Sequence, residues 1–160
     1  MQNITVLCVG KLKEKFYADA CAEYQKRLTR CCKLSLVELS EERLGENPSA
    51  AQIEVALERE AAAIEERLPR GGTVVALCVE GKALSSEELS ETLACCAVSG
   101  APQVTFIIGG SFGLSERVKR AADLRLSMSS MTFPHHLARV MLLEQLYRAY
   151  QIQKGTRYHK

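Results

Sequence analysis

The stretch from Val104 to Tyr150 constrains the fold of this chain more than any other. It opens with an apolar run of β-forming residues, 104–108, that ends in two glycines, and a short helix is predicted over 115–122. A second strand is predicted over 124–128, and a long apolar helix closes the stretch. Two strands that each lead through a loop into a helix are typical of an open α/β sheet, in which ligands bind at the carboxyl ends of the strands.

The rest of the chain repeats this alternation. Apolar runs predict three further strands over residues 4–9, 34–39 and 73–79, and periodic or capped segments predict helices over 14–30, 49–68 and 85–98. We expect Glu80–Lys82 to be a turn, and the last helix to run from Pro134 to about Gln153. Five strand–helix units predict a single α/β domain over 1–160, with a mostly parallel sheet and helices on both faces.

The composition is that of a globular protein. Of the 160 residues, 47% are hydrophobic and 25% are charged, which is compatible with one hydrophobic core. No apolar run approaches the length of a membrane span, and the first residues do not form a signal peptide, so we expect a cytoplasmic protein without a membrane partner. The seven cysteines are odd in number and contain no Cys-x-x-Cys pair, which favours free thiols in a reducing compartment and no metal site.

Charge is unevenly distributed along the chain. Residues 11–33 contain seven basic and three acidic side chains, and residues 139–160 contain five basic and one acidic, so each segment has a net charge of +4. Residues 41–67 contain three basic and eight acidic side chains, a net charge of −5. If the two basic ends meet in space they form a face suited to phosphate groups. On charge alone, incidental clustering on a solvated surface is an equally good explanation.

Two common phosphate-binding motifs are excluded. The segment Gly109–Gly113 lacks the G-x-G-x-x-G spacing of a dinucleotide site, and no acidic residue lies in 128–133. Neither Gly10-Lys11 nor Gly81-Lys82 is followed by the Ser or Thr of a Walker A loop. What remains is a glycine loop beside a loop of small and apolar residues. Such loops suit a flat ligand bound through main-chain groups, although two ordinary strand-to-helix turns give the same pattern.

Several segments together carry a resemblance to one family. They are Val9-Gly10-Lys11-Leu12-Lys13, Ile107-Ile108-Gly109-Gly110-x-x-Gly113-Leu114, Leu126-Ser127-x-Ser129, Met131-Thr132-Phe133-Pro134-His135, Arg139-Val140, Glu144-Gln145-Leu146-Tyr147-Arg148-Ala149 and Tyr158-His159-Lys160. With these segments the chain resembles the ribosomal RNA large subunit methyltransferase H family, within the SPOUT class of knotted methyltransferases. The resemblance covers essentially the whole chain, and it implies a trefoil knot that spans the last strands and the final helix.

The resemblance implies S-adenosylmethionine as the methyl donor and no metal. The residues that match the family's cofactor site are Leu77, Gly109, Met128, Ser129, Ser130, Met131, Thr132 and Phe133. For Leu77 alone, a leucine in the core of a strand is the stronger interpretation. At Gly109 we expect any added side chain to enter the volume of the cofactor.

Four residues are candidates for catalysis: Arg148, His159, Tyr158 and His135. Arg148 is a cation able to stabilise an anionic base, although Glu144 stands four residues before it and an ordinary helix-surface ion pair is the simpler interpretation. His159 is a candidate proton acceptor and Tyr158 a platform for a base, whereas His135 would shape the pocket. By composition the tail 156–160 is expected to fray, and only the family resemblance reverses that expectation.

The function that the resemblance implies is methylation of N3 of a pseudouridine in 23S ribosomal RNA, in the large subunit or the assembled ribosome. It also implies a homodimer in which the tail reaches the partner's pocket. The final helix is apolar on several sides, which is compatible with a dimer and with a central helix in a monomer. Two other classes stay open: a non-catalytic rRNA-binding or ribosome-assembly factor of the same fold, and an α/β enzyme that uses another adenosyl or nucleotide ligand.

Overall fold

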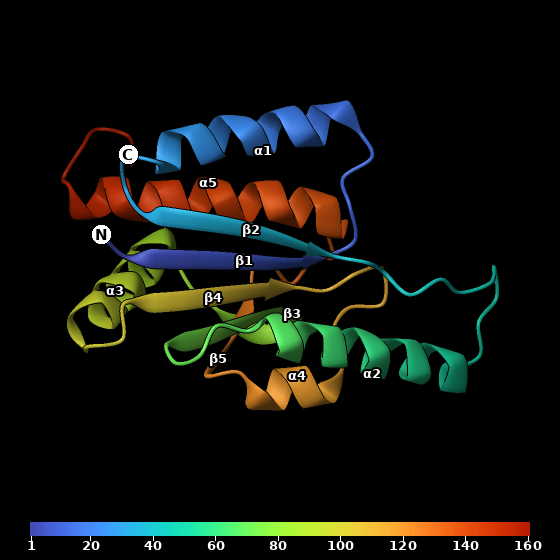
Figure 1. The fold of residues 1–160 in the computed structure, drawn as a ribbon. Coiled ribbons are helices and arrows are strands. Elements are labelled where there is room, and N and C mark those ends of the chain that lie inside the picture. Colours follow the sequence, from blue (N-terminus) through green and yellow to red (C-terminus); the bar gives the residue numbers. More distant parts are fainter.

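The computed structural model describes all 160 residues and contains one five-stranded sheet in which every paired strand is parallel. The strand order is β2-β1-β4-β3-β5 (Figure 1). The strands are β1 (Asn3–Val9), β2 (Lys33–Leu39), β3 (Thr73–Ala83), β4 (Gln103–Ile108) and β5 (Leu124–Ser127). The helices are α1 (Lys15–Leu28), α2 (Ala50–Arg67), α3 (Ser86–Val98), α4 (Glu116–Ala121) and α5 (His135–Gln153). The predicted α/β architecture is therefore confirmed.

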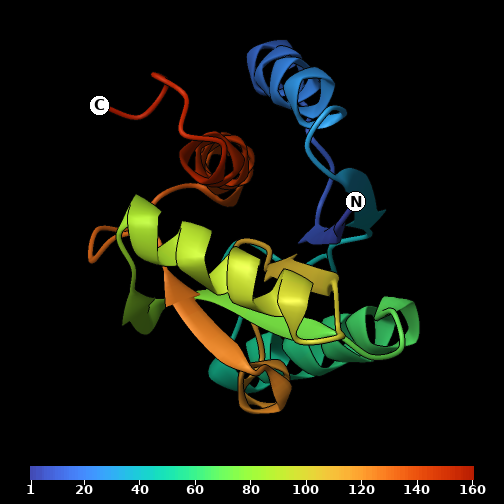
Figure 2. The same cartoon turned by 90° about the vertical axis from the view of Figure 1, so that its left-hand side faces the viewer.

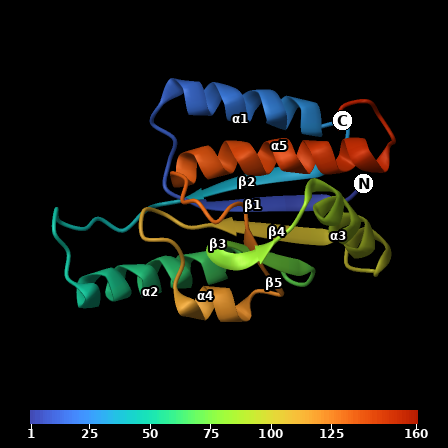
Figure 3. The same ribbon diagram turned by 180° about the vertical axis from the view of Figure 1, so that it is seen from behind.

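Helices cover both faces of the sheet (Figures 1 and 3). One face packs against α1, α3 and α5 in a cluster of 19 buried residues that includes Phe106, Leu143 and Leu146. The other face packs against α2 and α4 in a cluster of 9 buried residues that includes Ile64 and Ile107. Alternate residues of β1 and β4 point to opposite faces, which explains why the sequence of both strands is apolar throughout.

Helix α5 lies on the sheet between α1 and α3 (Figure 2). Leu142, Leu143, Leu146 and Ala149 are fully buried inside this chain, so much of the helix's apolar surface belongs to the core. Because α1 runs beside α5, the basic segments 11–33 and 139–160 are brought together (Figures 1 and 2). The two basic segments therefore meet in space, as a shared basic face requires.

Capping boxes set the starts of two helices as predicted. Ser49 and Ser85 each accept a hydrogen bond from the backbone N–H three residues later, and the side chains of Gln52 and Glu88 close the capping boxes. Pro134 differs slightly from the prediction: it is the N-cap residue, and helix α5 begins at His135.

The end of β3 differs from the sequence-based expectation of a strand that stops at Val79. Leu77 and Lys82 both face Leu126 of β5, so the chain between them loops out and the strand then resumes to Ala83. A Cβ on Gly81 would lie 2.8 Å from the carbonyl carbon of Arg125, a distance that only glycine avoids. Glu80–Lys82 is therefore part of a bulge inside a strand and not a turn between elements.

Two further observations concern the cysteines and the helices. All seven cysteines are free thiols in the structure. None of the five helices combines the length and the apolarity that crossing a membrane requires.

Candidate functional site

A cavity of about 730 Å³ lies at the carboxyl ends of the central strands. Its walls come from the end of β3, the glycine loop after β4 and the loop between β5 and α5. Most of the lining side chains are apolar, and the remaining surface is largely main chain and small residues. This is the position at which open α/β sheets bind ligands, and the size is that of a small-molecule site.

The glycine loop, residues 109–113, is closed by its own backbone. The N–H of Gly113 donates a hydrogen bond of 3.0 Å to the carbonyl of Gly110, and Gly113 has a φ of 78°, in the left-handed region. A Cβ on Gly109 would overlap the carbonyl group of Gly113 and lie 3.0 Å from its Cα. Our expectation that a side chain at Gly109 enters the cofactor volume is thus wrong for its first carbon, which meets the loop itself.

An acidic side chain from outside the loop fixes the glycine loop. Glu41, in the segment after β2, accepts a hydrogen bond of 2.8 Å from the backbone N–H of Ser111. Partial burial raises the pKa of Glu41, but the hydrogen bonds from Ser111 outweigh burial and hold the pKa below its usual value. A Cβ on Gly110 would lie only 2.6 Å from Oε1 of the same carboxylate. Sequence reasoning missed Glu41 because 70 positions separate it from Ser111.

The loop between β5 and α5 provides the opposite wall. Ser127 Oγ donates to the carbonyl of Ser129 (2.9 Å), and the N–H of Met131 donates to Ser129 Oγ (3.0 Å). These bonds keep the loop turned toward the cavity. Seven of the eight predicted cofactor residues line the cavity: Leu77, Gly109, Met128, Ser129, Met131, Thr132 and Phe133. Ser130 is exposed and does not line it.

One ion pair belongs to the cavity wall. Lys119 of α4 bonds to Glu80 of the β3 bulge, and both residues line the cavity. The Lys119 side chain is 14% exposed. Burial lowers the pKa of its ammonium group, but the bonds to Glu80 and Glu116 outweigh this and raise the pKa overall. The pair therefore places one positive and one negative group beside an otherwise apolar volume, and no sequence motif predicted it.

His135 also lies in the cavity wall, as expected of a residue that shapes the pocket. Its ring packs 4.1 Å from the ring of His136, centroid to centroid. Burial and the neighbouring His136 lower the pKa of His135, so its imidazole is neutral at physiological pH. Nε2 of His135 is buried without a hydrogen-bond partner in the protein.

Arg139 holds the start of α5 against the sheet. Its residue is only 3% exposed, and the guanidinium donates to Glu38 Oε2 (2.8 Å) and to the carbonyl of Gly10 (3.0 Å). Partial burial raises the pKa of Glu38, but the hydrogen bond and charge of Arg139 outweigh it, so the pKa lies below its ordinary value. Arg139 is therefore a structural residue and is not available to hold an RNA phosphate.

Replacing Arg139 by Met is expected to lower the free energy of unfolding by about 2–3 kcal/mol at pH 7, because the Gly10 carbonyl loses its buried donor. Glu38 has a lowered folded pKa, so its stabilising contribution is present above the ordinary carboxyl pKa and is lost as the pH falls through the folded value. The difference between wild type and variant should therefore shrink in acid. Urea denaturation at pH 7 and at about pH 4 measures it, and equal stability at pH 7 would contradict the structural role.

The residues predicted for catalysis, apart from His135, gather near the end of α5. Arg148 binds Glu144 with bonds of 2.6 Å and 3.1 Å, and its guanidinium lies 4.8 Å from the centroid of the Tyr158 ring. Tyr158 donates its hydroxyl to Glu144 (3.0 Å) and packs edge-on against Tyr147. Burial and the hydrogen bond to Glu144 raise the pKa of Tyr158 to about 12, so the phenol stays protonated. The helix-surface ion pair expected at Glu144 and Arg148 is confirmed.

The tail is ordered, in contrast to the fraying that its composition predicts. His159 Nε2 lies 2.7 Å from Glu87 of α3, and His159 Nδ1 lies 3.4 Å from Arg148 Nη1. Since an arginine can only donate, the proton of a neutral His159 belongs on Nε2, directed at Glu87. Nδ1 then carries a lone pair. Neither Glu87 nor Glu144 was singled out from the sequence as a partner of the tail.

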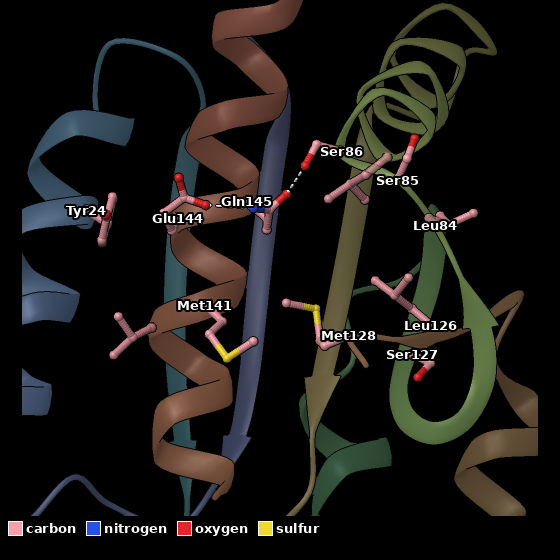
Figure 4. A pocket seen from close by; sticks show the side chains of 12 residues that line it. Tyr24, Leu84, Ser85, Ser86, Leu126, Ser127, Met128, Met141, Glu144 and Gln145 are labelled. Atoms are coloured by element: carbon pink, nitrogen blue, oxygen red, sulfur yellow. Dashed lines mark hydrogen bonds between the residues drawn. The ribbon is translucent and has the colours of Figure 1, made fainter. Parts of the chain in front are cut away.

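In one chain the tail cluster lies far from the cavity. His135 and Arg148 are thirteen residues apart on a single helix, which corresponds to about 20 Å. Between them, a second hollow of about 480 Å³ runs between α3, α5 and β5 (Figure 4). Met128 and Met141 line it toward the loop between β5 and α5, and Glu144 lines it toward the tail. A hydrogen bond of 2.6 Å from Ser86 to Gln145 joins its two sides.

The fold and the site together place the chain in a known class. The family model described as "Predicted SPOUT methyltransferase" matches residues 2–159. A solved structure, the probable methylase family protein from Haemophilus influenzae Rd KW20, superposes with a TM-score of 0.58 at 13% identity and covers 99% of this chain and 71% of its own. A putative methylase family protein from Neisseria gonorrhoeae gives a TM-score of 0.55 at 14% identity, with 99% and 86% covered. At such low identity the two structures support the fold alone.

Sequence relatives narrow this class. The ribosomal RNA large subunit methyltransferase H of Clostridioides difficile (strain 630) is 47% identical over 158 residues, 99% of each chain. The protein of the same name from Pelotomaculum thermopropionicum is 50% identical over 159 residues, again 99% of each chain. The chain therefore belongs to the ribosomal RNA large subunit methyltransferase H family of SPOUT methyltransferases. The resemblance derived from sequence motifs is confirmed.

Proposed function

We propose that this protein transfers the methyl group of S-adenosylmethionine to N3 of a pseudouridine in 23S ribosomal RNA. The observation that carries the proposal is the cavity at the carboxyl ends of β3, β4 and β5, in a chain of this family. We place the reaction in the cytoplasm, on the large subunit or the assembled ribosome.

The residues of the cavity fit the proposed cofactor. Apolar side chains such as Leu77 and Phe133 suit an adenine ring, and the glycine loop lets main-chain groups come close to it. The Glu80–Lys119 pair matches the opposite charges of the amino and carboxylate groups at the methionine end. When bound, the cofactor supplies an electrophilic methyl group on a sulfonium. The protein holds and orients both reactants, which contributes on the order of 7–11 kcal/mol.

The tail cluster supplies the proton chemistry that N3 methylation needs. N3 of the base is an imide nitrogen that must lose its proton before or during attack. The Arg148 cation stabilises the resulting anion and lowers the pKa of the imide. His159 accepts the proton on Nδ1 when Arg148 turns from that nitrogen to the anionic base, and Tyr158 provides the face against which the base stacks. Tyr158 itself does not accept the proton, because its raised pKa keeps the phenol protonated at neutral pH.

The separation within one chain argues that two chains form each site. Because about 20 Å of helix lies between His135 and Arg148, the tail cluster of one chain reaches a methyl donor only in the cavity of a second chain. The hollow between α3 and α5 leaves Val140 and Met141 partly exposed as an apolar contact surface for that second copy. We further propose that the strands β4 and β5, their loops and α5 form the trefoil knot that the family resemblance implies.

The protein is accordingly expected to be a homodimer at micromolar concentration, with an interface that includes α5. Analytical ultracentrifugation measures this directly, and replacing Met141 in the hollow by Glu is expected to favour the monomer, because it buries a charge in the interface. As a matched control, Val98→Glu introduces the same charge at an exposed position at the end of α3. A monomeric wild type would contradict the two-chain site.

The function itself is tested by nucleoside mass spectrometry of ribosomal RNA from cells with and without this chain. We expect N3-methylpseudouridine in the 23S rRNA of the first cells, its loss from the second, and its return with the wild-type gene. The alternative, a non-catalytic rRNA-binding or assembly factor, predicts unchanged modification and no binding of S-adenosylmethionine. An enzyme that uses another adenosyl or nucleotide ligand would also fail to bind S-adenosylmethionine in calorimetry.

A further inference from the structure

The segment between β1 and α1, together with the first two residues of α1, presents cations and an exposed aromatic ring that the proposed reaction does not use. We call residues 11–16 the lysine loop, although Lys15 and Phe16 already belong to α1. Lys11 and Lys13 are exposed and form no ion pair, whereas Lys15 bonds to Asp19 at 2.6 Å. Phe16 is 65% exposed, and its ring lies 4.4 Å from the neighbouring Tyr17 ring, centroid to centroid. A large aromatic side chain exposed beside free cations is unusual for a merely solvated loop.

The backbone of the lysine loop is fixed in place. Leu12 packs against the main core cluster, and its N–H donates to Glu38 Oε2 at 3.4 Å. The carbonyl of Gly10, directly before the loop, accepts the bond from Arg139. Glu14 lies 3.6 Å from His136 Nδ1. Because Leu12 points inward, Lys11 and Lys13 are held on the solvent side, so the loop is ordered before any ligand binds.

The same loop is continuous with the cofactor cavity. The Tyr17 ring lies 6.1 Å from the His136 ring, and the His136 ring lies 4.1 Å from that of His135, which lines the cavity. A row of four rings therefore runs from exposed Phe16 to the cavity wall. A ligand on the lysine loop would therefore lie near the cavity wall that contains His135.

We propose that the lysine loop is an RNA-binding surface that holds a single-stranded segment next to the methylated nucleotide. Lys11 and Lys13 pair with phosphates, and Phe16 stacks on an unpaired base. Stacking on an aromatic ring together with cations for the backbone is the chemistry that recognises single-stranded nucleic acid. This inference rests on the proposed function and adds to it the part of the protein that positions the RNA.

The test measures binding of two probes, deproteinised 23S rRNA and purified large ribosomal subunits, by fluorescence anisotropy over a range of salt concentrations. The double variant Lys11→Ala/Lys13→Ala is expected to bind both probes less tightly and to lower the slope of log affinity against log salt by about 1.4, or roughly 0.7 per lost phosphate contact. Phe16→Ala is expected to weaken binding about tenfold at every salt concentration and to leave the slope unchanged.

Matched controls lie at the other end of the molecule. Arg70→Ala removes an exposed cation before β3, and Val98→Ala shortens an exposed apolar side chain at the end of α3; neither should change binding. Calorimetric affinity for S-adenosylmethionine and the thermal midpoint are expected to be equal in all variants. These readouts separate a loss of RNA binding from a loss of structure.

Wild-type binding of both probes by the folded lysine and Phe16 variants would overturn the proposal, as would a wild type that binds neither probe. Weaker binding of subunits with unchanged binding of deproteinised RNA would also overturn it, because the loop would then contact a ribosomal protein. Loss of RNA binding in the variants, found together with a wild type that transfers no methyl group, would refute the proposed function and leave the RNA-binding surface standing.

Discussion

Replacing Gly109 by Val is expected to lower the affinity for S-adenosylmethionine at least tenfold in a protein that still folds. The added Cβ would overlap the carbonyl of Gly113, so the glycine loop has to open. Opening breaks the Gly110–Gly113 hydrogen bond and moves the loop into the cavity that it lines. Gly109→Ala carries the same first carbon and should show most of this effect. Isothermal titration calorimetry measures the affinity, and circular dichroism confirms folding.

Two other glycines calibrate this result. At Gly45 an added Cβ meets nothing within 4 Å, so Gly45→Ala is expected to leave cofactor affinity and stability unchanged. At Gly113 the space is also open, but the φ of 78° makes an alanine strained by about 1–2 kcal/mol. If Gly109→Val folds and binds the cofactor like wild type, Gly109 does not belong to the site. If Gly45→Ala is as damaging as Gly109→Ala, the overlap is not the cause.

The sequence predicts the fold well because local signals and burial agree. Apolar runs such as 4–9 lie on strands covered on both faces, and the capping boxes at Ser49 and Ser85 start the helices they predict. The prediction for the end of β3 is wrong because the Glu80–Lys82 segment has turn-forming residues, whereas its pairing depends on β5, more than forty positions later. A bulge is a property of two strands and cannot be read from one.

In the candidate site, too, the local features are predictable from the sequence and the long-range contacts are not. The glycine loop and the loop at 128–133 are local features, and the structure places them on opposite walls of one cavity. Glu41, Glu80 and Glu87 act through partners 70, 39 and 72 positions away. In the sequence they are surface carboxylates like many others. Composition also fails to predict the ordered tail, because the tail is held by Glu87 on α3 and Glu144 on α5.

The second large effect is expected for the tail. Tyr158→Ala and His159→Ala should each lower methylation of ribosomes at least tenfold, about 1.4 kcal/mol of barrier, with unchanged affinity for S-adenosylmethionine. Tyr158 contacts Tyr147, Arg148 and Glu144 on the surface of α5, so its removal should cost only about 1 kcal/mol of stability. The matched variant Tyr158→Phe keeps both ring contacts and loses only the hydroxyl bond to Glu144, and it should retain most of the activity. Single-turnover assays on ribosomes separate these variants.

Mixed dimers decide where the tail acts. A chain that ends at Gly155 keeps its cavity but lacks the tail, and a Gly109→Val chain keeps its tail but lacks a working cavity. Because about 20 Å separates the two parts within one chain, the mixed dimer contains one complete site only if the tail crosses to the partner. We therefore expect each variant to be inactive alone and the verified mixed dimer to regain partial activity. An inactive mixed dimer would place the tail at its own cavity, and full activity of the truncated chain alone would remove the tail from the reaction.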